Sequence, residues 1–240
     1  SGSSLCGLNM SFRASESLSE QIAQHLAQQI IMGDLVEGER IQELRIASEL
    51  NVSRGSVREA LLILARKRLI EIFPRRGAVV SEMSAVQVKS LYEVLSMLLQ
   101  LACRKAAENW RQHDMESFVG QMQRLQGYVD ELDVEGFHEG TFEFFHMVYR
   151  FANNGYVADI LEDLQPAVRR AAYLALHTDR RELEESLSFL KGVVDGIMMR
   201  KGDQAASLID DFCTHQRNQV LDALLRVKQI EVAWAQRYRR

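Results

Sequence analysis

The sequence predicts a mainly α-helical protein, with an N-terminal winged helix-turn-helix domain and a C-terminal all-α helical bundle. Three observations support this fold class. The 240-residue chain has only two prolines, so long stretches carry no helix breaker. Apolar residues recur with helical spacing over most of the chain. Two short β-prone runs flank a turn framed by Pro74 and Gly77, which is typical of a hairpin wing.

The expected domain boundaries follow from these patterns. We place the winged helix-turn-helix domain at residues 13–82 and the all-helical domain at residues 84–228. Residues 1–12 are interpreted as a disordered leader or a cloning remnant, because they lack the basic start and apolar core of a signal peptide. Residues 229–240 are expected to form a C-terminal tail.

The composition and the cysteine spacing indicate where in the cell the protein is located. No apolar run reaches the roughly 20 residues that a membrane-spanning helix needs, so no membrane contact is expected. The three cysteines are far apart and show no CxxC spacing, which argues against a disulfide scaffold or a cysteine zinc site. A cytoplasmic location is therefore expected.

Charge is distributed unevenly along the chain. The formal net charge is -4, but a nucleic-acid footprint is local and the distribution matters more than the sum. Residues 51–80 carry seven positive and two negative side chains, a local balance of +5. These are Arg54, Arg58, Arg66, Lys67, Arg68, Arg75 and Arg76 against Glu59 and Glu71.

The first two helices are short and amphipathic. The first is predicted over residues 16–32 and ends at Gly33, and a turn around Gly38 separates it from the second, which ends at Asn51. Their apolar stripes are Leu18, Ile22, Leu26 and Ile30, followed by Ile41, Leu44, Ala47 and Leu50.

A third helix begins after only three residues, NVS. Ser53 and Ser56 both suit its N-cap, and Ser56 with Glu59 has the capping-box spacing. Arg54 and Arg58 are four residues apart, so they share one face near the helix start. A major-groove helix commonly makes its base contacts there.

The wing and the bundle complete the chain. LIEIF and AVVSE are the two strand-like runs around the turn PRRG. From Ser84 onward the pattern stays helical, and the short linker VSEMSAV indicates a semi-rigid lever between the domains. The expected helices are 84–108, 113–132, 134–152, 155–176, 179–200 and 202–228.

The segment from Ile41 to Glu82 resembles the DNA-binding domain of the GntR family of bacterial regulators. That family shows a helix-turn-helix pattern close to LGVSRTPVREAL and a wing of the form RRGxxV, and the counterparts here are Leu50 to Leu61 and Arg75 to Val79. The remainder is similar to the FCD effector domain of the FadR-type subgroup. This resemblance implies effector binding and dimerisation in the helical domain.

The resemblance also implies a set of DNA contacts from the recognition helix, the turn before it and the wing tip. Arginine can pair bidentately with guanine, serine hydroxyls and helix-start amides bind phosphate, and glycine allows close approach. Without this context, such arginines are more often plain solvated surface. The candidates are Arg45, Ser53, Arg54, Gly55, Ser56, Arg58, Arg75, Arg76 and Gly77.

The FCD resemblance further implies a divalent metal, zinc or nickel, held by one aspartate and three histidines. His146 and His215 match two of these positions. Phe142 occupies the aspartate position, and Leu190 or Val193 occupies that of the remaining histidine. Two histidines form an incomplete site, since zinc normally takes at least three protein ligands. A metal-dependent carboxylate sensor remains an alternative.

The apolar replacements favour a different ligand. We expect a rather apolar pocket that suits acyl or aromatic effectors, unless the same side chains simply fill the space. The candidate lining is Leu95, Leu99, Phe142, Phe145, His146, Leu190 and His215.

The predicted function is a sequence-specific, DNA-binding transcription regulator, expected to be a repressor. It would bind an inverted-repeat operator as a homodimer under the control of a small-molecule effector. Remote alternatives are a helical-bundle enzyme, in which Glu143 would join the two histidines, and a protein-interaction module that has lost DNA binding.

Overall fold

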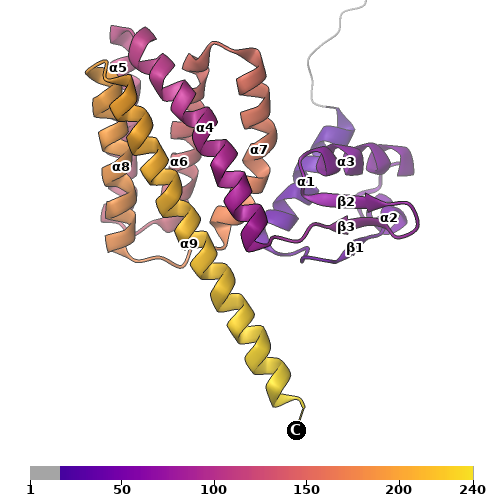
Figure 1. Cartoon of the computed structure of the whole chain (residues 1–240). Coiled ribbons are helices and arrows are strands. Elements are labelled where there is room, and N and C mark those ends of the chain that lie inside the picture. Colours follow the sequence, from indigo (N-terminus) through magenta and orange to yellow (C-terminus); the bar gives the residue numbers. More distant parts are fainter. Residues whose placement is uncertain (1–16, 240) are drawn as a thin grey trace, which may run out of the picture.

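The computed structural model describes residues 17–239, and it has two parts (Figure 1). A winged helix-turn-helix domain is followed by an all-helical bundle, which confirms the predicted fold class. The expected leader at residues 1–12 lies outside the described residues.

The N-terminal domain alternates short helices with a small sheet. Ser17 and Glu20 form a capping box at the first helix, and Gly33 ends that helix in the left-handed region with φ of 84°. The elements are α1 (Leu18–Met32), β1 (Arg40–Ile41), α2 (Glu43–Leu50), α3 (Arg54–Arg66), β2 (Ile70–Phe73) and β3 (Gly77–Val80).

The strands form one antiparallel sheet in the order β1-β3-β2. Ile41 pairs with Ala78, and Ile70 pairs with Val80. Buried side chains of the helices and the sheet share one core, since Leu64 and Ile70 are at most 1% exposed. This core fixes the hairpin against α3, so the wing has a rigid base.

The C-terminal domain is a bundle of long helices. Its elements are α4 (Ala85–Asn109), α5 (Gln112–Asp130), α6 (Val134–Tyr149), a 3₁₀ turn (Arg150–Ala152), α7 (Gly155–Tyr173), α8 (Arg180–Met198) and α9 (Gly202–Arg237). The expected helix over 134–152 is α-helical to Tyr149 and continues as the 3₁₀ turn to Ala152, after which Asn153 adopts a left-handed conformation and Asn154 caps α7 with its side chain.

The first and last helices of the bundle run antiparallel. Tyr92 Oη donates to Gln216 at 2.7 Å, and Ser96 Oγ donates to Asp210 at 2.7 Å. At the far end, Arg104 Nε donates to Asp203 at 3.0 Å. These bonds join α4 to α9 along most of the length of α4.

The last helix is longer than predicted. It continues to Arg237 and therefore runs through the segment that we expected to be a tail. In Figure 1 its C-terminal part projects beyond the other helices of the bundle. Residues 224–237 have no helix breaker, which explains why the helix does not end at residue 228.

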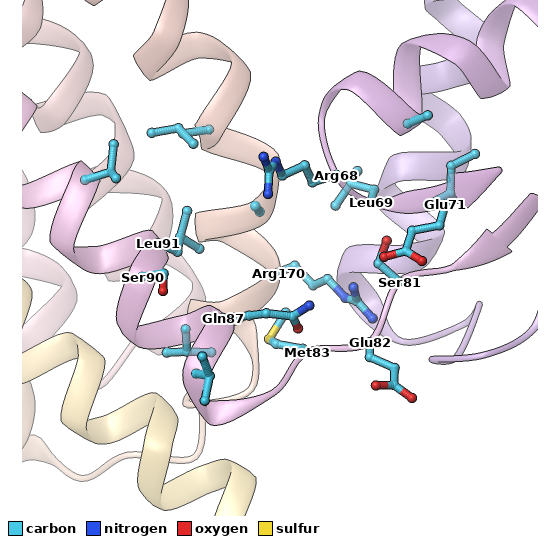
Figure 2. Close-up of a pocket in the computed structure, with 17 residues that line it drawn as sticks. Arg68, Leu69, Glu71, Ser81, Glu82, Met83, Gln87, Ser90, Leu91 and Arg170 are labelled. Carbon is cyan, nitrogen blue, oxygen red and sulfur yellow. The ribbon is translucent and has the colours of Figure 1, made fainter. Parts of the chain in front are cut away.

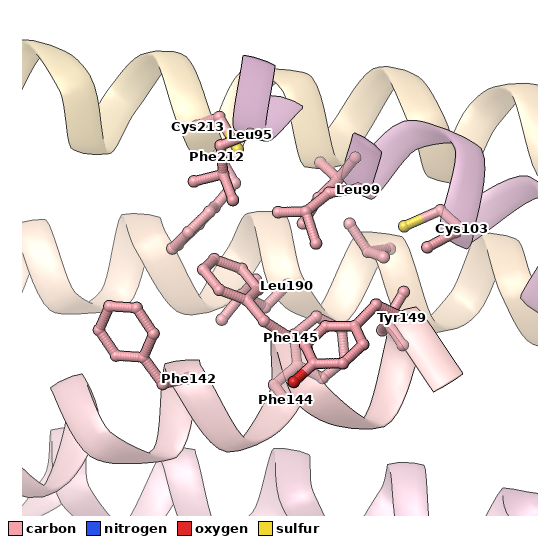
Figure 3. Close-up of a cluster of buried hydrophobic side chains, with 14 of the residues drawn as sticks. Leu95, Leu99, Cys103, Phe142, Phe144, Phe145, Tyr149, Leu190, Phe212 and Cys213 are labelled. Carbon is pink, nitrogen blue, oxygen red and sulfur yellow. The ribbon is translucent and has the colours of Figure 1, made fainter. Parts of the chain in front are cut away.

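Aromatic and aliphatic side chains fill the centre of the bundle (Figure 3). Phe145 contacts both Phe142 and Phe212 edge to face, with ring centroids 5.8 and 5.7 Å apart. Leu99 and Leu190 are fully buried beside them. Cys103 and Cys213 are also buried in this core.

The two domains are joined by more than the linker. Helix α1 packs against α7. The backbone N–H of Met83, in the linker, donates to the carboxylate of Glu37. Ser84 then starts α4 with a capping box. Within residues 17–239, no helix is both long enough and apolar enough to cross a membrane.

Candidate nucleic-acid interface

The helix-turn-helix is built by local hydrogen bonds. Asn51 ends α2 in the left-handed region with φ of 52°. Ser53 is the N-cap of α3, and its Oγ accepts from the backbone N–H of Ser56 at 3.1 Å. Ser56, the other predicted cap, instead lies in the first turn, where its hydroxyl is 2.9 Å from that of Ser53. Gly55 lies between the two serines, in the same turn.

The predicted capping box between Ser56 and Glu59 is absent from this helix start. Glu59 points away from it and accepts a hydrogen bond from Ser19 Oγ on α1 at 2.6 Å. The side chain therefore ties α3 to α1. Spacing alone fitted both serines, and the structure shows that Ser53 is the cap.

Both recognition-helix arginines lie beside one acidic residue of α2. A guanidinium nitrogen of Arg58 is 2.9 Å from Glu43 Oε1, and Arg54 Nε is 3.8 Å from the same oxygen. Both arginine side chains are more than half exposed. The start of α3 thus presents two cations that keep access to solvent. The sequence alone did not point to Glu43, because its contacts with the two arginines become visible only when α2 is packed on α3.

Arg45, the candidate on α2, lies on an exposed face. Its Nε donates to Glu49 Oε1 at 2.8 Å, one helical turn away. An exposed pair of this kind is easily separated. Leu44, which was expected in the apolar stripe of this helix, is instead 61% exposed.

The wing is a short hairpin with an exposed basic tip. Arg75 and Arg76 are exposed in the turn between β2 and β3. The Arg76 guanidinium lies over the Phe73 ring, 5.4 Å from its centroid. Gly77 has φ of 72°, a conformation that side-chain-bearing residues adopt only with strain. Glycine is therefore required where the chain turns back into β3.

The seven predicted effector-pocket residues are not all brought together. Leu95, Leu99, Phe142, Phe145 and Leu190 are buried in the centre of the bundle. His146, by contrast, is exposed. It follows the outward stripe of α6, which repeats every three or four residues through Glu139, Glu143, His146 and Arg150. Its ring nitrogen Nδ1 is hydrogen-bonded to the hydroxyl of Tyr149.

His215 faces the bundle interior. Its Nε2 atom is buried and has no hydrogen-bond partner in residues 17–239. Its Nδ1 atom is 3.9 Å from Glu185 Oε1, and its ring is 5.8 Å from that of Phe189. An unpaired buried nitrogen is costly, so this atom has unused capacity to bond a polar group.

The histidines do not assemble into a metal centre. Among the described residues, no group of three or more histidine, cysteine, aspartate or glutamate side chains is placed to hold a metal ion. Phe142, at the family's aspartate position, is instead covered by the guanidinium of Arg169, 4.4 Å from the ring centroid. Arg169 also forms an ion pair with Glu139.

His138, which the sequence did not single out, packs edge to face on Phe142 at 4.9 Å. Burial lowers the pKa of His138 to about 4, with Glu139 opposing this shift and Arg169 adding to it. The imidazole is therefore neutral at pH 7. The sequence signal for His138 is its position, one helical turn before the residue that aligns with the family's aspartate.

Two family models match the chain. Residues 18–80 match bacterial regulatory proteins of the gntR family. Residues 90–214, more than half of the chain, match the FCD domain. The two matches fall on the two parts of the fold.

Curated relatives and solved structures agree with these matches. The HTH-type transcriptional repressor RspR of Escherichia coli K12 is 22% identical over 220 residues, which cover 90% of this chain and 93% of the relative. The gluconate operon transcriptional repressor of Bacillus subtilis is 26% identical over 172 residues, covering 70% and 69%. The structure of E. coli McbR/YncC has a TM-score of 0.73 at 20% identity and covers 87% of this chain and 99% of its own.

The family resemblance inferred from the recognition helix and the wing is thereby confirmed. Members of this family regulate transcription, which removes the helical-bundle enzyme as an alternative. The chain belongs to the GntR family of bacterial regulators, in the FadR-type subgroup with a C-terminal FCD domain, and is a DNA-binding transcription regulator.

Proposed function

We propose that this regulator is a cytoplasmic, sequence-specific repressor that binds an inverted-repeat operator as a homodimer. A small effector held by the helical domain controls its DNA affinity. The exposed, basic start of α3 is the observation that carries the proposal. Arg54 and Arg58 extend from one face there, and Arg75 and Arg76 extend from the wing. The family's repressors provide the precedent for repression.

We assign the base contacts to Arg54 and Arg58, because a guanidinium can pair with guanine in the major groove. Ser53, Gly55 and Ser56 contact phosphate at the helix start. Arg45 and the wing-tip residues, Arg75, Arg76 and Gly77, contact the backbone beside the site.

The projecting part of α9 supports a homodimer. Val220 and Ala223 are buried in the bundle, and the same face continues outward as Val227, Ile230 and Trp234, each at least 45% exposed. This spacing alternates three and four residues, as in a coiled-coil seam. A second copy would cover these side chains and provide the second recognition helix that an inverted repeat requires.

For the effector, we propose a largely apolar molecule with one hydrogen-bonding group. The aromatic cluster around Phe142 and Phe145 favours an apolar body. The unpaired Nε2 of His215 suits one polar group. Opening a site there requires the packed side chains to move, which would couple ligand binding to the shape of the bundle.

The proposal is tested by selecting genomic DNA fragments on the purified protein and measuring their affinity by fluorescence anisotropy. We expect an inverted repeat, bound by two subunits, and a loss of at least tenfold in affinity for Arg58→Ala. Arg150→Ala, on the exposed surface of the bundle, is the matched control and should bind like the wild type. Equal affinity for selected and random DNA would refute sequence-specific binding.

A further inference from the structure

A cleft of about 690 Å³ lies between the winged helix-turn-helix domain and the bundle (Figure 2). The base of the wing lines one side, and α4 and α7 line the other. Ligand pockets typically enclose about 300–1,000 Å³, so this space is large enough for a small molecule. It is separate from the aromatic centre of the bundle, with which it shares no lining residue named above.

The bundle side of the cleft is apolar. Val86, Leu91 and Val94 of α4 and Leu164 of α7 line it. Val86 is 73% exposed and Val94 is 44% exposed, although both are hydrophobic. A ligand with an apolar body would remove this surface from water, at about 25 cal/mol per Å² of area.

Two arginines reach into the same cleft from opposite domains. Arg68 comes from the turn after α3, where its backbone adopts φ of 59°, and Arg170 comes from α7. Burial lowers the pKa of Arg170, and the charge of Glu37 opposes that shift. Within the described residues, neither guanidinium has a hydrogen bond or an ion pair within 4.0 Å. Both therefore have donors available for an anion.

The acidic residues of the cleft limit where an anion can lie. Glu71 and Glu82 line the side formed by the sheet and the linker. These two carboxylates repel a negatively charged group, so an anion in the cleft depends on the two arginines for its attraction. Charge and apolar surface together thus define an orientation for the ligand.

We propose that the interdomain cleft is a binding site for an amphipathic carboxylate. The carboxylate lies between Arg68 and Arg170, and the apolar body lies on α4 and α7. Because the ligand contacts both domains, it fixes their relative orientation. Its effect on operator binding rests on the function proposed above, whereas the binding itself does not.

Isothermal titration calorimetry on the full chain tests the site. The probes are decanoate and 2-naphthoate, with decanol and 2-naphthol as neutral partners of the same shape. We expect at least one carboxylate to bind with a submillimolar Kd and its neutral partner to bind at least tenfold more weakly. Arg170→Met and Arg68→Met should each weaken the carboxylate at least tenfold. Arg150→Met, which removes an arginine outside the cleft, should not.

A second variant separates shape from charge. Val94→Trp fills the cleft without changing a charge and should abolish binding of the carboxylate. The proposal is overturned if neither carboxylate binds the wild type at 5 mM, or if Arg170→Met binds as tightly as the wild type. It is also overturned if Val94→Trp changes the subunit stoichiometry in native mass spectrometry, since the cleft would then be an interface between copies. Carboxylate binding without any operator binding would retain the site and refute only the proposed function.

Discussion

Arg58 on α3 donates a hydrogen bond to Glu43 on α2, with 2.9 Å between the two side chains. Arg54 shares the same carboxylate at 3.8 Å. The arginines assigned to base recognition are thus partly neutralised in the free protein. Exposed ion pairs contribute only about 0–1 kcal/mol, so DNA can displace this carboxylate at low cost.

Glu43→Gln should therefore raise affinity for random DNA more than affinity for the operator. We expect a gain of about two- to fivefold on random DNA, because the exposed pair is worth at most about 1 kcal/mol. Anisotropy titrations at several salt concentrations measure both affinities. Glu184→Gln, an exposed glutamate on α8, removes the same charge elsewhere and should change neither. An unchanged or lower affinity for random DNA would mean that Glu43 does not compete with phosphate.

Arg75→Ala should weaken binding nearly uniformly across sequences. A residue that contacts phosphate contributes about one unit to the slope of log K against log salt, so the slope should become shallower by about one. Arg58→Ala, by comparison, should relax the sequence preference at particular base pairs. A sequence-dependent loss for Arg75→Ala would show that the wing reads bases instead of the backbone.

Gly77→Ala and Gly55→Ala should change stability in opposite directions. Gly77 has φ of 72°, so alanine there should cost about 1 kcal/mol or more of unfolding free energy. At Gly55, in helix α3, an added Cβ would meet only Ser53 Oγ at 3.9 Å, and alanine should stabilise by up to about 1 kcal/mol. Urea unfolding measures both. Destabilisation by Gly55→Ala would show that the start of α3 is more crowded than the structure indicates.

Charged residues on the projecting part of α9 should dissociate the homodimer. Ile230→Glu with Trp234→Glu places two carboxylates on the exposed apolar stripe. We expect a monomer in light scattering after size exclusion, and operator affinity at least tenfold lower. Gln229→Glu with Gln236→Glu adds the same charge at other exposed positions and should leave a dimer. A dimer in both variants would place the interface elsewhere.

Acid should destabilise the bundle through His138. Its folded pKa of about 4 lies below the ordinary value of 6.5, so the unfolded chain binds the proton more readily between these values. The contribution of neutral His138 to the free energy of unfolding is fully present above about pH 6.5 and is lost as the pH falls towards 4. A shift of this size corresponds to no more than about 3–4 kcal/mol of unfolding free energy.

Comparing His138→Phe with the wild type by urea unfolding at pH 7.5 and pH 4.5 tests this. The variant should lose less stability on acidification. His113→Gln, at a 78% exposed side chain, should behave like the wild type. If His138→Phe loses as much stability in acid as the wild type, the acid destabilisation comes from carboxylates and not from His138.

The elements that local chemistry determines could be predicted from the sequence. The turn at Asn51, the two strands of the wing and the left-handed Gly77 all follow from residue type and spacing. What it left open depends on neighbours from distant segments. Glu59 was expected in a capping box but bonds Ser19 of α1 instead, and Glu43 gains its role only from the packing of α2 on α3.

The effector region shows the same limit more strongly. Alignment placed His146 beside His215, but the outward stripe of α6 leaves His146 at the surface. The cleft between Arg68 and Arg170 could not be anticipated, because its two sides come from separate domains. Periodicity predicts which face of a helix is buried and not which helix covers it.

The pairing of α4 with α9 constrains the order of folding. Their hydrogen bonds join residues separated by 99 to 124 positions in the chain. During synthesis at about 5–20 residues per second, the N-terminal domain emerges complete while α4 still lacks its partner for several seconds or more. Helices α6, α7 and α8 can pack on α4 earlier, but the part of α4 that contacts α9 stays uncovered until the C-terminal helix leaves the ribosome. Newly made chains are thus most vulnerable to aggregation in the interval between the two events, and a slower codon tract within α9 would lengthen it.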